Sequence, residues 1–172
     1  RQNRISDYLD WVDGLNFVNF ERSTLDSTAF NAAFDIYSAG DCNESVKALS
    51  NYLSRFEKGI FALRANYYLA QCANQLNQVS QAKQAYEAIL EFPRNEYTPM
   101  ALENVAGMAY QAKEYAKARN YYKQLADIAQ DKAKRTQAHA GIMRSSFALG
   151  DYSEAAVHAD LVLGMEVQDA TL

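Results

Sequence analysis

Hydrophobic residues recur along most of the chain at steps of three and four positions, which is the spacing of an amphipathic helix. The pattern is clearest between residues 101 and 126, where a short polar turn separates two such series. The first series is Ala101, Val105, Ala109 and Ala112, and the second is Tyr115, Ala118, Tyr122, Leu125 and Ala126. Each series gives a helix one apolar face. We therefore expect pairs of helices whose apolar faces must be covered by neighbouring pairs.

The polar turn between two helices occurs four times at a nearly constant interval. Its four copies begin at Gly40, Asn77, Lys113 and Gly150, which lie 37, 36 and 37 residues apart. Glycine suits the left-handed residue that ends a helix, and asparagine tolerates that conformation. Lys113 departs from this rule, so we expect mild strain or a different turn there. The interval predicts four helix–turn–helix units.

Acidic residues after two of the turns indicate how the following helix begins. Asp41 with Glu44, and Asp151 with Glu154, have the spacing of a capping box. In that motif the first side chain accepts a hydrogen bond from the helix backbone, and the second side chain accepts one from the first residue's N–H. We expect a reciprocal cap at both places.

Small residues stand at fixed places in these units. The first helices carry Ala33, Ala70 and Ala106, and the second helices carry Ala82, Ala118 and Ala155, with Tyr86 and Tyr122 four residues on. On these residues the chain resembles the tetratricopeptide repeat family, whose unit is a helix–turn–helix of about 34 residues. Ser45 and Met143 depart from the small positions, and the early Trp of the family is missing. The resemblance implies an all-α solenoid of about four antiparallel helix pairs that wind into a right-handed superhelix.

The resemblance covers about residues 26–166 and places units at about 26–60, 61–97, 98–133 and 134–166. Residues 167–172 are expected to form a tail, and the last unit has no polar helix to cover it. An uncovered apolar face favours either continuation of the chain or self-association through the repeat ends.

Residues 1–25 do not fit the repeat. A series at helical spacing suggests a short helix here, formed by Ile5, Tyr8, Leu9, Val12 and Leu15. We expect this segment to cover the first helix pair or to join a missing upstream unit. The chain begins with Arg1, and we interpret it as a piece of a longer protein.

Three short segments indicate a particular subtype within this family. Residues 52–56 and 65–71, together with the Phe92-Pro93 pair, are similar to the cell-envelope subtype of these repeats. That subtype occurs in bacterial periplasmic cell-division coordinators and in outer-membrane assembly lipoproteins. The likeness favours the bacterial periplasm or outer membrane as the location, with the cytoplasm as the alternative.

Charge and composition exclude several classes of partner. The formal net charge is −4 and the pI is near 5.2, which argues against nucleic acid as the main partner. The longest apolar runs, such as residues 60–63, are too short to span a bilayer. Cys42 and Cys72 fit no metal-binding spacing. We expect them to be buried thiols rather than a disulfide, because a chain of this size needs no covalent staple.

No motif for catalysis, nucleotide binding or metal binding occurs in the sequence. The two histidines, His139 and His158, fall on different predicted helices, and we interpret them as interhelical or surface residues. The sequence therefore predicts no catalytic residue, no cofactor and no metal, and a protein that is not an enzyme.

Stacked helix pairs leave a concave groove that is lined mostly by the first helices. By resemblance, the candidate groove residues are Phe30, Phe34, Tyr37, Arg64, Tyr67, Gln71, Asn74, Gln75, Glu103, Gly107, Tyr110, Gln111, Gln137, Arg144 and Phe147. Rings supply contact area at low entropic cost, and amides satisfy the backbone groups of an extended peptide. The cation cluster that would clamp the C-terminal carboxylate of a chaperone is missing, so we expect no such binding.

The leading interpretation is a non-catalytic scaffold that binds a peptide or protein partner through this concave face. Two alternatives stay open, a carbohydrate-binding outer-membrane lipoprotein and a non-catalytic part of a larger enzyme or regulator.

Overall fold

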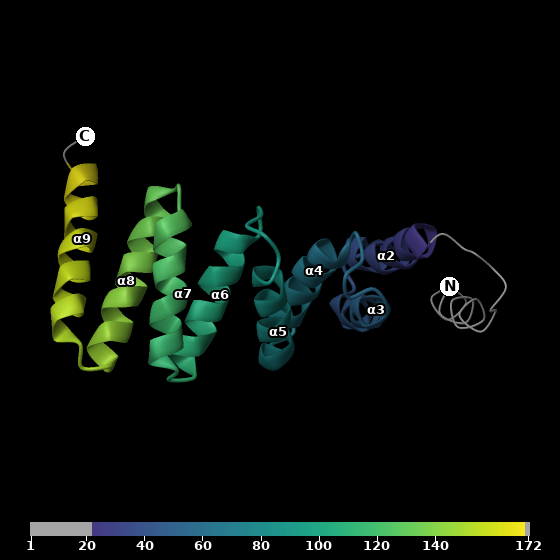
Figure 1. Ribbon diagram of the computed structural model, residues 1–172, viewed down its shortest axis with the longest axis horizontal. Coiled ribbons are helices and arrows are strands. Elements are labelled where there is room, and N and C mark those ends of the chain that lie inside the picture. Colours follow the sequence, from purple (N-terminus) through teal and green to yellow (C-terminus); the bar gives the residue numbers. More distant parts are fainter. Residues whose placement is uncertain (1–21, 171–172) are drawn as a thin grey trace. The chain divides into compact units, whose positions relative to one another are not determined.

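The computed structural model describes residues 22–170, with the side chains of residues 24–165, and all regular secondary structure in this part of the chain is helix. Its helices are joined in pairs by tight turns (Figure 1). The pairs are α2 (Arg22–Ser38) with α3 (Cys42–Arg55), α4 (Ala62–Gln75) with α5 (Val79–Leu90), α6 (Thr98–Gln111) with α7 (Tyr115–Ile128), and α8 (Lys132–Ala148) with α9 (Tyr152–Ala170). The predicted all-α architecture of helix pairs is confirmed. The expectations for residues 1–21 and 171–172 lie outside the described residues.

The chain divides into two compact units, of which unit 1 ends at Ala88 and unit 2 begins at Ile89. In unit 1, α2 packs against α3 and α3 packs against α4. In unit 2, α6 packs against α7, α7 against α8, and α8 against α9, so each helix lies beside the next in chain order (Figure 1). In unit 2, α7 and α8 thus each bury their apolar residues against the helix before and the helix after them.

The four predicted bends are equivalent in backbone conformation. Gly40, Asn77, Lys113 and Gly150 all have positive φ, at 82°, 57°, 62° and 79°. At the last three bends the next residue donates its N–H back across the helix end, from Gln78 to Ala73, Glu114 to Ala109 and Asp151 to Ser146, at 2.8–2.9 Å. This is the Schellman ending of a helix. Lys113 therefore adopts the same turn as the others, and the alternative of a different turn there is wrong.

At each of the two predicted caps, only one of the two hydrogen bonds of the capping box forms. The Asp41 carboxylate accepts from the Glu44 N–H at 3.1 Å, and the Asp151 carboxylate accepts from the Glu154 N–H at 3.2 Å. The glutamates do not complete the box, because each carboxylate has cationic neighbours instead. Glu44 binds Lys47, and Glu154 binds Arg119 and Lys123.

Small residues mark the helix crossings, as the resemblance implied. The alanines at the crossing positions are at most 6% exposed in the folded chain: Ala33, Ala70, Ala82, Ala106, Ala118 and Ala155. In unit 2 the core joins three helices through Leu102, Ala106 and Ala109 of α6, Ala118, Tyr122 and Leu125 of α7, and Ala138 and Ile142 of α8. Close approach of the backbones allows these short side chains to fill the space between helices.

A buried carboxylate ties the helices of unit 1 together. Asp26 of α2 is 4% exposed and accepts hydrogen bonds from the Tyr52 hydroxyl of α3 and, at 2.7 Å, from the Ile60 N–H in the loop before α4. Burial, and then the bond to Asp26, raises the pKa of Tyr52. Since a buried carboxylate is costly without such partners, the three groups fix how α2, α3 and this loop meet.

Cys42 and Cys72 form a disulfide, with their Cα atoms 4.9 Å apart. The expectation of two buried free thiols is therefore wrong. Cys42 begins α3 and Cys72 lies near the end of α4, and the two helices pack against each other. Antiparallel neighbours bring the start of one helix beside the end of the other. This places the two sulfurs together across 30 residues of sequence.

Candidate peptide-binding faces

The first helices of unit 1, α2 and α4, share a polar and aromatic surface that we call the unit-1 face: Phe34, Tyr37, Arg64, Tyr67, Tyr68 and Gln71. A chain of hydrogen bonds crosses it. The Tyr37 hydroxyl donates to Gln71 Oε1 at 2.7 Å, and Gln71 Nε2 donates to the Tyr67 hydroxyl at 2.6 Å. Burial, and then the nearby Tyr67 and Tyr68, raises the pKa of Tyr37. The chain fixes the amide of Gln71 between two hydroxyls.

Arg64 lies among the rings of this face. Its guanidinium carbon is 5.2 Å from the Phe30 ring centre, 5.6 Å from that of Phe34 and 5.8 Å from that of Tyr68. One guanidinium nitrogen also donates to the Tyr68 hydroxyl at 3.1 Å. Stacking on aromatic faces restrains an otherwise flexible cation, and the residue is still exposed. A restrained, exposed guanidinium is suited to hydrogen bonding with a ligand.

Tyr68 is the centre of the aromatic cluster, although it is not among the residues predicted from the sequence. Its ring centre lies 4.4 Å from that of Tyr37 and 5.2 Å from that of Phe34. Phe30, in contrast, is 1% exposed and stacks on Phe61 at 4.5 Å. Phe30 is therefore a core residue that supports the face from below, and its assignment to the groove is wrong. Asn74 is exposed near the end of α4.

The first helices of unit 2, α6 and α8, form a second surface, the unit-2 face: Glu103, Tyr110, Lys134, Gln137 and Arg144. Glu103 of α6 accepts from the Lys134 ammonium at 3.0 Å and from the Gln137 amide at 2.9 Å, both on α8. Lys134 thus balances the negative charge of the Glu103 carboxylate, and the two donors together fix its position. Gln137 is among the predicted groove residues, whereas the sequence did not predict Lys134.

Arg144 lies over the ring of Tyr110, with its guanidinium carbon 5.9 Å from the ring centre. It also hydrogen bonds to Tyr122 of α7, where burial raises the pKa of the hydroxyl and Arg144 opposes that rise. Between Glu103 and Tyr110, the α6 residue Gly107 carries no side chain, and a Cβ there would meet nothing closer than the Tyr122 hydroxyl at 4.0 Å. The middle of the α6 surface therefore leaves its backbone accessible.

Two other predicted residues of unit 2 lie away from these contacts. Gln111 is exposed at the end of α6. Phe147, near the end of α8, is 64% exposed and packs edge-on against Tyr152 of α9, with ring centres 5.3 Å apart. The predicted groove residues do lie on the first helices, and in each unit some of them contact one another.

The described residues contain no group of three or more His, Cys, Asp or Glu side chains placed to hold a metal ion. His139 of α8 and His158 of α9 do meet, with their Nδ1 atoms 3.0 Å apart. Within the same part of the chain, no helix has the length and apolar character needed to cross a membrane. The two faces offer rings, amides and cations, which can bind a ligand by stacking and hydrogen bonding.

No protein-family model matches the sequence, and no curated protein matches it either. Solved structures do match in fold. A MamA structure aligns with a TM-score of 0.63 at 16% identity, covering 99% of this chain and 90% of that one. A Podosopora anserina putative kinesin light chain with nearly identical TPR-like repeats aligns with a TM-score of 0.58 at 12% identity, covering 98% and 86%.

Pseudomonas aeruginosa PilF is similar as well, with a TM-score of 0.56 at 19% identity over 86% of this chain and 67% of that one. Likeness at such low identity concerns the fold, and it agrees with the helix pairs, the equivalent bends and the alanines at the crossings. The chain therefore has the fold of a tetratricopeptide-repeat array.

Proposed function

We propose that the chain is a non-catalytic scaffold that binds extended peptide segments of a partner protein through the first-helix face of each unit. The observation that carries this proposal is the hydrogen-bonded series Tyr37–Gln71–Tyr67 beside the ring-stacked Arg64. Donors and acceptors held in place lose little entropy when a peptide backbone binds to them. Rings beside them supply apolar contact area.

The unit-2 face supports the same proposal with different chemistry. Glu103 is held by two donors, and Arg144 is stacked on Tyr110, so both signs of charge are presented in fixed positions. The accessible backbone at Gly107 leaves room for a ligand chain between them. Such a surface favours a peptide with charged as well as apolar side chains over a purely apolar one.

The proposal is tested by selecting peptides from a random displayed library against the intact chain and measuring their affinities for variants. Tyr37→Phe, Arg64→Ala and Arg144→Ala should each weaken a selected peptide roughly tenfold or more, a loss of about 1.4 kcal/mol per factor of ten. The matched control is Lys47→Ala, which removes an exposed cation from a second helix, α3. If the control weakens binding as much as the face variants do, the proposed faces are not the binding surface.

The disulfide supports a location in an oxidising compartment, such as the bacterial envelope. Disulfides persist in the periplasm and outside cells, whereas cytosolic thiols are kept reduced. Cys42 and Cys72 are joined in the folded chain. Alkylation of thiols in intact cells of the source organism should leave both cysteines unmodified until a reductant is added. Two alkylated cysteines without reductant would contradict an oxidising location.

A further inference from the structure

The last helix, α9, carries an exposed apolar stripe. Val157, Leu161 and Gly164 are spaced by four and three residues, so they lie on one side of the helix. Val157 is 57% exposed and Leu161 is 41% exposed. A Cβ built at Gly164 would meet nothing within 4 Å, so the helix backbone is accessible there. Exposed apolar residues that line up on one helix side form a surface suited to a partner helix.

The earlier second helices are mostly polar at the corresponding positions. These residues are Lys47, Asn51 and Ser54 of α3, Gln84, Ala88 and Glu91 at α5, and Asn120, Gln124 and Asp127 of α7. The three in α7 are exposed even though α8 packs against that helix. Stacking of the next helix pair therefore leaves this side of a second helix in solvent. A further repeat would leave the stripe of α9 uncovered in the same way, so the stripe is suited to a different occupant.

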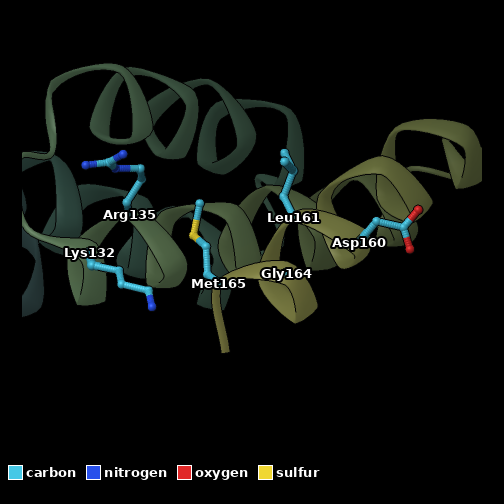
Figure 2. Close-up of a pocket in the computed structure, with 6 residues that line it drawn as sticks. All are labelled: Lys132, Arg135, Asp160, Leu161, Gly164 and Met165. Atoms are coloured by element: carbon cyan, nitrogen blue, oxygen red, sulfur yellow. The ribbon is translucent and has the colours of Figure 1, made fainter. Parts of the chain in front are cut away.

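A hollow of about 520 Å³ adjoins the stripe, lined by Lys132 and Arg135 of α8 and by Asp160, Leu161, Gly164 and Met165 of α9. Figure 2 shows the two cations at one end of the hollow and Asp160 at the other, with the apolar residues between them. Rotation by 180° about the middle of this surface would exchange its charged ends. The surface is therefore complementary in charge to a second copy of itself.

We propose that this surface is the interface of a homodimer, in which the α9 helices of two copies pack antiparallel around a two-fold axis near Leu161. Leu161 then meets its counterpart, Val157 fills the space that Gly164 leaves open, and Asp160 meets Lys132 and Arg135 of the other copy. A two-fold interface uses the same patch on both subunits, as this arrangement requires. The interface lies on α9 and the start of α8, and it shares no residue with the two peptide-binding faces.

The apolar part of the interface is tested by measuring the mass in solution over a concentration series, by light scattering or sedimentation. The intact chain should move from 19.3 kDa toward twice that mass as its concentration rises. Leu161→Glu should hold the chain at the monomer mass. The matched control is Leu163→Glu, because Leu163 is 58% exposed on another side of the same helix. This control should dimerise as the unmodified chain does.

The charged part is tested by exchanging charges between the two ends of the surface. Asp160→Lys alone, and Lys132→Glu with Arg135→Glu, should each weaken dimerisation, because like charges then face each other across the axis. An equimolar mixture of the two variants restores both ion pairs. It should recover dimers with an affinity within a few-fold of the unmodified chain.

Four results would overturn the proposal. The first is a chain that stays at 19.3 kDa at every concentration. The second is a loss of dimers in Leu163→Glu equal to that in Leu161→Glu, with both variants folded by circular dichroism. The third is a mixture of the charge variants that associates no better than either alone, because this excludes the two-fold arrangement. Growth beyond the dimer mass would likewise exclude a closed interface.

Discussion

Gly141 of α8 lies against Tyr122 of α7 so closely that a Cβ on residue 141 would be 2.5 Å from the ring atoms. The aromatic ring of one second helix thus occupies the space that the next first helix leaves by having no side chain. Gly141→Ala should destabilise the chain by about 1–3 kcal/mol, because the ring is buried and has little room to move. Urea unfolding followed by circular dichroism measures the change.

Gly107 provides the control for this prediction. It also lies within a first helix, α6, but a Cβ there would meet only the Tyr122 hydroxyl at 4.0 Å. Gly107→Ala should therefore stabilise the chain by about 0.5–1 kcal/mol through helix propensity. Equal effects of the two glycine substitutions on the free energy of unfolding would mean that the Tyr122–Gly141 contact does not determine how closely α7 and α8 pack.

Lys113 holds the left-handed conformation that Gly40 and Gly150 hold at the equivalent bends, with φ of 62°. A residue with a Cβ pays about 1 kcal/mol for this conformation. Lys113→Gly should therefore raise the free energy of unfolding by about that amount, measured by urea denaturation. Gly150→Ala should lower it by a similar amount, since its φ is 79°. A destabilising Lys113→Gly would show that the lysine side chain stabilises the turn.

The disulfide should contribute substantially to the free energy of unfolding of unit 1. It closes a separation of 30 residues, and the chain-entropy relation gives about 3–4 kcal/mol for a loop of this length. Reduction, or Cys42→Ser with Cys72→Ser, should lower the melting temperature. The double variant should then be insensitive to reductant. Two titratable thiols in the native, unreduced chain would contradict the pairing.

The contact between His139 and His158 should make α8–α9 packing sensitive to acid. Burial lowers the pKa of His139 below its ordinary 6.5, and the neighbouring His158 and Arg135 lower it further against Asp127. Burial also lowers the pKa of His158, with Lys123 adding to this and Glu154 opposing it. The unfolded chain therefore binds more protons than the folded chain just below pH 6.5.

The stability contributed by neutral His139 and His158 is therefore complete above about pH 6.5. It is lost as the pH falls through their folded-state pKa values. The melting temperature should fall over that window. Glu154 stays ionised there, because its bonds to Lys123 and Ser146 lower its pKa to about 2. Replacing both histidines by Gln should flatten the profile above pH 4.5. An unchanged profile in this variant would assign the acid sensitivity to other groups.

The repeat could be predicted from the sequence, because its signals are properties of single residues and their near neighbours. Gly40 and Asn77 mark helix ends by the conformations they tolerate, and Ala118 marks a crossing by its size. Such signals depend on a few neighbouring residues and hold in any packing. The positions of the bends and of the buried alanines could therefore be derived before any coordinates.

Contacts between helices were harder to predict. Tyr68 rather than Tyr67 is the centre of the unit-1 rings, and one residue along a helix turns a side chain by about 100°. Phe30 shares the helical spacing of Phe34, yet it lies in the core because of how α2 is rotated. The disulfide was not predicted, because a core of this size needs no covalent bridge and the spacing of Cys42 and Cys72 does not show which helix ends become neighbours.

The central claim, that the first-helix faces bind peptide, is tested most directly by mapping a selected peptide onto the intact chain by amide chemical shifts in NMR. The account predicts that the shifted amides cluster in α2, α4, α6 and α8, around residues such as Gln71 and Glu103. Shifts that cluster instead in α3, α5, α7 and α9 would contradict it.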